Sequence, residues 1–256
     1  MTWFRFNGFF SAPVSRNTPA RRGDTITPDA QAQEAPGPAD PPLSYDGPLL
    51  IVGGGTVESS LLRELAARAV GLVGADSGAD RIVEAGLVPD AVIGDMDSVR
   101  DLAGLPQATR IIEIADQNST DFEKALSMTT APLTLALGMT GGRFDHTLAA
   151  LHAVTTRAET RRIILVDEHD LALGVAGSIR LAVGSGTRVS IYPLGRTAFS
   201  GSQGLLYPLD GLDMEQGRQI GTSNSAVADE IEIEVAPGVQ SPWLLILDRT
   251  KLPIFF

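Results

Sequence analysis

The 256-residue chain contains no cysteine. This absence excludes a disulfide framework, a thiolate nucleophile and a zinc site with cysteine ligands. Lysine is almost absent as well, because only Lys124 and Lys251 occur among the twenty basic residues. We therefore expect any ammonium group at a functional site to be that of Lys124.

Long apolar runs and an excess of basic residues are missing too. No apolar stretch approaches the ~20 residues that cross a bilayer, so we expect no membrane partner and a cytoplasmic location. The net charge of −11 argues against nucleic-acid binding, which requires a basic face. An acidic chain suits a cationic small substrate, and it can bind ATP where metal ions and a few arginines screen the phosphates.

The first 23 residues lack acidic side chains, and half of the sixteen prolines lie within the first 48 residues. An arginine-bearing, acid-free start with several aromatic residues superficially resembles a transit peptide, although it lacks the apolar core of a secretory signal. Proline-rich polar segments bury too little surface to become ordered. We predict that residues 1–46 form a disordered extension.

Six short apolar runs between residues 49 and 170 each end at a turn that carries glycine or aspartate. Runs of this kind, alternating with helical patterns, predict a doubly wound parallel α/β sheet over residues 47–175. Ligands bind beyond the carboxyl ends of such strands, so the turns should meet at one rim. The runs are 49–52 before Gly53, 71–75 before Asp76, 91–94 before Asp95, 110–114 before Asp116, 133–138 before Gly141, and 162–166 before Asp167.

Helical spacing of apolar residues covers 57–69. Further helices are expected after the capping signal at 119–121 and from Asp145 onward. Beyond residue 176 the apolar residues alternate with period two, as in 187–194 and 228–235, which predicts a smaller C-terminal β-sandwich over 176–256.

Gly53, Gly54 and Gly55 follow the first run and are expected to form a phosphate cradle at a helix N-terminus. Asp76 ends the second run, where it would contact a ribose hydroxyl. This pair keeps a nicotinamide-dependent oxidoreductase open as an alternative. However, Glu58 stands where the dinucleotide fingerprint requires its third glycine.

Two carboxylates stand two residues apart, at Asp95 and Asp97, directly after the third run. Such a pair can hold Mg²⁺, which takes one or two carboxylates together with substrate phosphates. The alternative is a turn stabilised by aspartate side chains, with Ser98 capping a following helix.

The segment 141–146 combines two glycines with Arg143 and Asp145, so that the backbone can approach a ligand while an arginine holds phosphate oxygens. His146 is expected to have a structural role. His152 lies on an apolar helical pattern and is expected in the core.

These motifs together resemble the thiamine pyrophosphokinase (thiamine diphosphokinase) family. The matching segments are GDMDS at 94–98, DQNSTDFEKAL at 116–126 and GMTGGRFDHTL at 138–148, followed by GLLYPL at 204–209 and TSN at 222–224. The resemblance covers about residues 48–238. It implies an α/β catalytic domain, a β-sandwich, and a homodimer whose subunits jointly form each site. The implied reaction transfers the pyrophosphoryl group of ATP to the hydroxyl of thiamine and releases AMP, with Mg²⁺ as cofactor.

From the motifs and the resemblance together we predict four sets of site residues. They are Asp95, Asp97 and Asp121 for the metal; Asp121, Arg143 and Asp145 for catalysis; Gln117, Thr120, Ser223 and Asn224 for the substrate; and Gly53, Gly54, Gly55, Asp76, Lys124 and Gly142 for the nucleotide.

The chain departs from the family pattern at Met96, Asn118 and Ser77. None of these departures removes an expected metal ligand, but the family has glycine where Ser77 stands, so the resemblance supports the contact on the nucleotide side less strongly. A non-catalytic nucleotide or thiamine sensor with the same fold is a second alternative, but every metal-matching position retains its acid.

Overall fold

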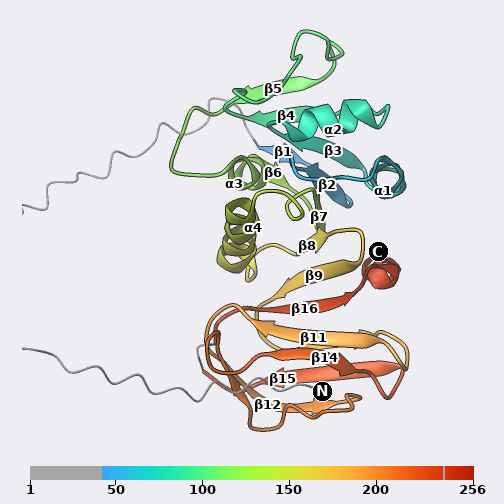
Figure 1. The fold of residues 1–256 in the computed structure, drawn as a ribbon, viewed down its shortest axis with the longest axis vertical. Helices are drawn as coiled ribbons and strands as arrows, with labels where there is room; N and C mark the ends of the chain where they lie inside the picture. The colour runs from blue at the N-terminus through green and yellow to red at the C-terminus, as the bar shows by residue number, and fades with distance from the viewer. Residues whose placement is uncertain (1–41, 239) are drawn as a thin grey trace, which may run out of the picture.

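The computed structural model describes residues 42–238 and 240–256. Its main feature is a ten-stranded sheet in which all six predicted apolar runs are parallel neighbours (Figure 1). In spatial order these strands are β8 (Ile163–Val166), β7 (Thr134–Leu137), β2 (Leu49–Val52), β3 (Gly71–Ala75), β4 (Ala91–Gly94) and β5 (Arg110–Glu113). The carboxyl ends of the six strands therefore lie along one edge of the sheet.

Helices cover both faces of this parallel region, as the doubly wound prediction requires. α1 (Ser59–Ala66) and α2 (Gly78–Glu84) bury apolar side chains against one face, and α3 (Asp121–Ser127) and α4 (Phe144–Arg157) bury theirs against the other. The two faces are separate because alternate residues of each strand point to opposite sides of a sheet. A short parallel pair, β1 (Leu43–Ser44) with β6 (Thr129–Thr130), lies beside α3.

The second half of the chain is antiparallel. It extends the large sheet beyond β8 through β9 (Asp170–Val175), β16 (Trp243–Asp248), β11 (Arg188–Pro193) and β14 (Gly221–Ser225). A separate four-stranded sheet contains β10 (Ile179–Ala182), β15 (Glu230–Val235), β12 (Thr197–Gln203) and β13 (Asp213–Met214). The chain ends in a 3₁₀ helix, η1 (Arg249–Phe255), which contacts β9 and β16.

These two antiparallel layers enclose an apolar core. The ring of Phe199 from one layer meets the ring of Trp243 from the other edge-to-face, with 5.6 Å between centroids. Ile231 and Ile233 are fully buried in this core, as the alternation predicts. The mixed fold, with a parallel-rich sheet and a separate antiparallel sheet, agrees with the predicted class.

Residues 1–41 lie outside the described part of the chain. The predicted disorder of residues 1–46 therefore stays a prediction. The boundary predicted at 175 stays a prediction, since the large sheet continues across it from β8 to β14.

Three local details differ from the expectations. The described segment between β4 and β5 contains no helix, so Ser98 does not cap one, as the alternative to a metal site had required; its hydroxyl donates to Asp97 instead, at 2.7 Å. α4 begins at Phe144, and Asp145 lies in its first turn rather than capping it. His152 is exposed, because the apolar stripe of α4 that faces the sheet runs through Ala150, Ala153 and Val154. None of the helices in the described part of the chain has the length and apolar character that spanning a membrane requires.

Candidate active site

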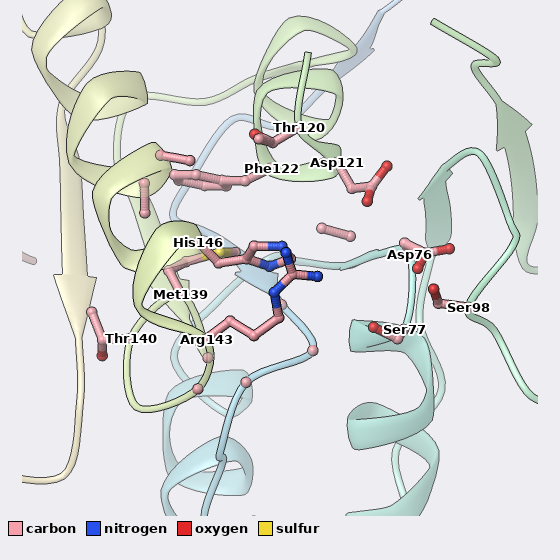
Figure 2. Close-up of a pocket in the computed structure, with 18 residues that line it drawn as sticks. Asp76, Ser77, Ser98, Thr120, Asp121, Phe122, Met139, Thr140, Arg143 and His146 are labelled. Atoms are coloured by element: carbon pink, nitrogen blue, oxygen red, sulfur yellow. The ribbon is translucent and has the colours of Figure 1, made fainter. Parts of the chain in front are cut away.

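A cavity of about 390 Å³ opens at the carboxyl ends of β2, β3 and β7, between the N-terminal ends of α3 and α4. Figure 2 shows Arg143 and His146 reaching into it from α4, with Asp76 and Asp121 on the opposite side. Eight of the predicted site residues line it: Gly53, Gly54, Gly55, Asp76, Thr120, Asp121, Gly142 and Arg143.

Three carboxylates converge beside this cavity. One oxygen each of Asp76, Asp95 and Asp97 lies within 4.8 Å of the others. The register between strands explains the convergence: Ala75 pairs with Ile93, and the Asp76 amide donates to the Ile93 carbonyl at 2.9 Å. The two strand ends therefore present their acids side by side, close enough together to offer ligands to one cation.

Asp76 is the buried member of this cluster, at 4% exposure, and its backbone is left-handed with φ of 47°. Its Oδ1 atom is buried and has no hydrogen-bond partner among the described residues. Burial raises the pKa of Asp76 above its usual range, and the nearby charges of Asp121 and Asp95 raise it further. A buried carboxylate oxygen without a donor is a costly arrangement, and binding a cation relieves it.

Asp121 lies outside the group of three and is held by Lys124. The Lys124 ammonium donates to Asp121 Oδ1 at 2.9 Å and to Asp95 Oδ2 at 3.4 Å. Gln117 also donates to Asp95 Oδ2, at 3.3 Å. Burial alone would raise the pKa of Asp95, but the bonds from the Asp97 amide and from Lys124 lower it below its ordinary value.

The turn Gly53–Gly55 lines the cavity and packs closely against the loop that follows β7. A Cβ added at Gly55 would lie 2.6 Å from the Gly138 carbonyl oxygen, and one at Gly53 would lie 2.8 Å from the same atom. These positions admit only glycine, because a backbone atom cannot move aside as a side chain can. A Cβ at Gly54 would lie 2.2 Å from the Ser77 hydroxyl.

Arg143 and Asp145 form an exposed bidentate pair, with a shortest distance of 2.6 Å between Nη2 and Oδ2. The hydrogen bond from Arg143 lowers the pKa of Asp145. Arg143 lines the cavity, whereas Asp145 lies outside the set of described lining residues and supports Arg143 from beside it.

Thr120 lines the cavity, but its hydroxyl serves the capping box of α3. It accepts from the Glu123 amide at 3.3 Å and donates to the Glu123 carboxylate at 2.9 Å. Such a cap fixes the start of the helix and thereby the position of Asp121, the next residue.

Ser223 and Asn224 are not brought to this cavity within one chain. They lie on β14, six strands from β2, which corresponds to roughly 29 Å at ~4.8 Å per strand. Asn224 is buried; its side chain accepts from the Tyr207 amide at 3.1 Å and donates to the Tyr207 carbonyl at 2.7 Å. Ser223 is exposed and left-handed, with φ of 60°.

The sequence reasoning missed several residues that line the cavity. His146 is exposed and lies in the cavity, where we had expected a structural role. Its position three residues after Arg143, about one helical turn along, was the signal that could have indicated this. Phe122 and Met139 supply an apolar wall suited to a flat ring, and Ser77 and Ser98 add hydroxyls.

Comparison with known families gives two matches. The model of "Thiamin pyrophosphokinase, catalytic domain" matches residues 62–165. The model of "Thiamin pyrophosphokinase, vitamin B1 binding domain" matches residues 178–239. Together they cover the parallel region from α1 to β8, without β2 and the glycine turn, and the antiparallel part up to residue 239.

Individual relatives agree with these matches. Thiamine pyrophosphokinase 2 of Arabidopsis thaliana is 30% identical over 189 residues, covering 65% of this chain and 68% of the relative. Thiamin pyrophosphokinase 1 of Caenorhabditis elegans is 27% identical over 158 residues, covering 56% and 65%.

Solved structures share the fold. Thiamin pyrophosphokinase from Geobacillus thermodenitrificans aligns with a TM-score of 0.65 at 24% identity, over 78% of this chain and 97% of the other. The Candida albicans enzyme aligns with a TM-score of 0.66 at 15% identity, over 81% and 93%. The fold, the two family matches and the sequence relatives agree, and the chain belongs to the thiamin pyrophosphokinase family.

Proposed function

We propose that this protein is a thiamine pyrophosphokinase, which transfers the pyrophosphoryl group of ATP to the hydroxyl oxygen of thiamine and releases AMP. The observation that carries the proposal is a cavity lined by a glycine turn and an arginine, with three carboxylates converging beside it at the same rim of a family-matched fold. This is the inventory that phosphoryl-transfer chemistry uses, because such catalysis is mostly positioning and charge stabilisation.

In this reaction the thiamine oxygen forms a bond to the β-phosphorus, and the bond from that phosphorus to the oxygen of AMP breaks. Arg143 is placed to bind the phosphate oxygens on which charge develops. The hydroxyl proton passes to a carboxylate base. Asp121 suits this role better than Asp145, because Asp121 lines the cavity and Asp145 lies outside its lining.

The donor set fits Mg²⁺, the cofactor that we propose. Hard oxygen ligands alone are offered, and the unpartnered buried oxygen of Asp76 supports a cation beside Asp95 and Asp97. When bound, the metal would neutralise phosphate charge. We therefore propose Asp76 as a metal ligand in addition to the predicted set, in place of the ribose contact first expected for it.

Replacing Asp76 by Asn should stabilise the metal-free protein while abolishing activity. Because the pKa of Asp76 is raised on folding, its ionised form opposes folding at neutral pH, and this cost disappears as the pH falls and the carboxylate takes up a proton. Asparagine tolerates the left-handed backbone. We expect a melting temperature about 2–4 °C above wild type in EDTA near neutral pH, with a smaller difference at acidic pH. A variant that melts lower than wild type under both conditions would contradict this assignment.

We propose that two copies of the chain complete each site, so that the exposed Ser223 of one copy reaches the cavity of the other, while the buried Asn224 beside it holds the segment at Tyr207 in place. Exposed apolar side chains near both regions support this: Phe144 (75% exposed) and Leu148 (52%) on α4, and Leu206 (52%) and Val227 (54%) beside β14. A two-fold dimer can bury both patches at once, since each occurs on both copies.

Replacing Leu206 by Glu should therefore dissociate the dimer and lower activity in parallel. The matched control is Ile111→Glu, the same change at a 43%-exposed residue of β5 at the opposite end of the large sheet. Sedimentation measurements should give a monomer for Leu206→Glu and a dimer for wild type and control. Full activity in a monomeric Leu206→Glu protein would exclude a shared site.

The function is tested by incubating the protein with ATP, Mg²⁺ and thiamine. Thiamine diphosphate and AMP should accumulate together. Folded protein that binds ATP or thiamine without forming AMP would indicate the sensor alternative. Hydride transfer with a nicotinamide cofactor would indicate the oxidoreductase, which leaves Asp95, Asp97, Asp121 and Arg143 without a role. The cytoplasmic location and the absence of nucleic-acid partners stay predictions from the sequence.

A further inference from the structure

Lys124 is a buried cation at the back of the acidic cluster. Its side chain is 2% exposed, and it lies on α3 one turn after Asp121. The described residues that line the cavity do not include it. A contact between Lys124 and a nucleotide in the cavity, which the sequence suggested, is therefore disfavoured by its position.

The ammonium is instead engaged by two carboxylates from different elements. It joins Asp121 of α3 to Asp95 at the end of β4, at 2.9 and 3.4 Å. Lys124 contacts only one oxygen of each carboxylate; Oδ1 of Asp95 accepts from the Asp97 amide at 3.3 Å, and Asp95 also belongs to the group of three with Asp76 and Asp97. One fixed cation thus sets the orientation of two acids at the rim.

Charge balance explains why a cation is needed here. Asp76, Asp95, Asp97 and Asp121 place four like charges near one another, and like charges at this separation oppose each other's ionisation. Lys124 offsets one of them from the protein side. Its compact ammonium fits a buried space between two carboxylates, whereas the planar guanidinium used at eighteen of the chain's twenty basic positions is wider.

We propose that Lys124 is a positioning residue, an internal cation that orients Asp95 and Asp121 toward the cavity and lowers the affinity of the acidic cluster for divalent ions. The inference rests on the proposed metal-dependent function. It assigns Lys124 no contact with substrate or nucleotide.

The test compares Lys124→Met, which keeps the approximate length without the charge, with Lys124→Arg, which keeps the charge. Binding of Mn²⁺ alone to the ATP-free protein is measured by calorimetry, and kcat and the KM for ATP are measured separately. We expect Lys124→Met to bind Mn²⁺ roughly tenfold more tightly than wild type. A tenfold change is what removing the repulsion between one ammonium and a divalent cation several ångströms away should give in a water-like medium. Its kcat should fall by ~10- to 100-fold with the KM for ATP within about twofold of wild type.

Lys124→Arg should keep the Mn²⁺ affinity within about threefold of wild type and recover part of kcat, because the charge remains. Tighter metal binding together with slower turnover is the result expected of a positioning cation, and it is not expected of a residue that contacts the nucleotide. A raised KM for ATP with unchanged Mn²⁺ affinity would show a nucleotide contact and overturn the proposal. Unchanged or weaker Mn²⁺ binding by Lys124→Met would overturn it as well.

Should Lys124→Met not fold, the same comparison is made between Asp121→Asn and the double variant Asp121→Asn, Lys124→Met, in which the buried pair is removed as a unit. Removing the lysine should again tighten Mn²⁺ binding roughly tenfold, and no gain would overturn the proposal. Failure of the proposed function is distinguishable, because wild-type protein would then form no AMP, whereas the Mn²⁺ measurement does not depend on turnover.

Discussion

Asp97→Asn should reduce kcat more than ~100-fold, because loss of a direct metal ligand costs more than loss of a residue that only supports a ligand. The melting temperature should stay within about 2 °C of wild type. Asp97 is exposed at the end of β4, so the fold gains little from its carboxylate. Its oxygen belongs to the group with Asp76 and Asp95, where a neutral amide would bind a dication poorly. Turnover and thermal unfolding are measured on the same preparation.

Glu113→Gln is the matched control for this variant. Glu113 is an exposed carboxylate at the end of the neighbouring strand β5, outside the residues that line the cavity. It should retain nearly full activity. If Asp97→Asn unfolds instead, the carboxylate stabilises the turn and the metal role is contradicted.

Arg143→Ala should lower kcat by roughly 100- to 1,000-fold. This is the usual cost of removing one hydrogen-bond donor that stabilises the charge developing in a transition state. The guanidinium lines the cavity, and its pair with Asp145 fixes the direction of the fork. Arg143→Lys should recover only part of the rate, because an ammonium cannot form two parallel bonds to a phosphate. Steady-state kinetics in both substrates measure the effect.

The control for these variants is Arg218→Ala, which removes a 62%-exposed arginine from the antiparallel part of the chain. It should behave as wild type. Equal activity of Arg143→Lys and wild type would show that Arg143 supplies only charge, and a wild-type rate for Arg143→Ala would remove it from the mechanism.

The strands of the parallel region and their common rim were predictable from the sequence because each run and its turn are local patterns. LLIV before Gly53 and AVIG before Asp95 each name a strand end, and the parallel topology then places these ends together. α1 was likewise predictable from its apolar spacing, and α3 from its capping signal.

The contents of the site were less predictable because they depend on register and packing. Asp76 joins Asp95 only because β3 and β4 pair in one register, which no residue pattern states. His146 and His152 lie six residues apart on one helix, and the way in which α4 packs at the cavity decides which of them enters it: His146 lies in the first turn of α4, at the cavity, and His152 lies further along. The distance from β14 to the cavity depends on the order of all the intervening strands.

The central claim is that ATP is cleaved between its α- and β-phosphorus atoms and that the pyrophosphoryl group passes to thiamine. ATP labelled only at the β-phosphorus, incubated with thiamine and Mg²⁺, tests this directly. We predict that the label appears in thiamine diphosphate, that AMP is formed in equal amount without label, and that EDTA stops both. Label retained in ADP, or no thiamine-dependent cleavage by folded protein, would contradict the account.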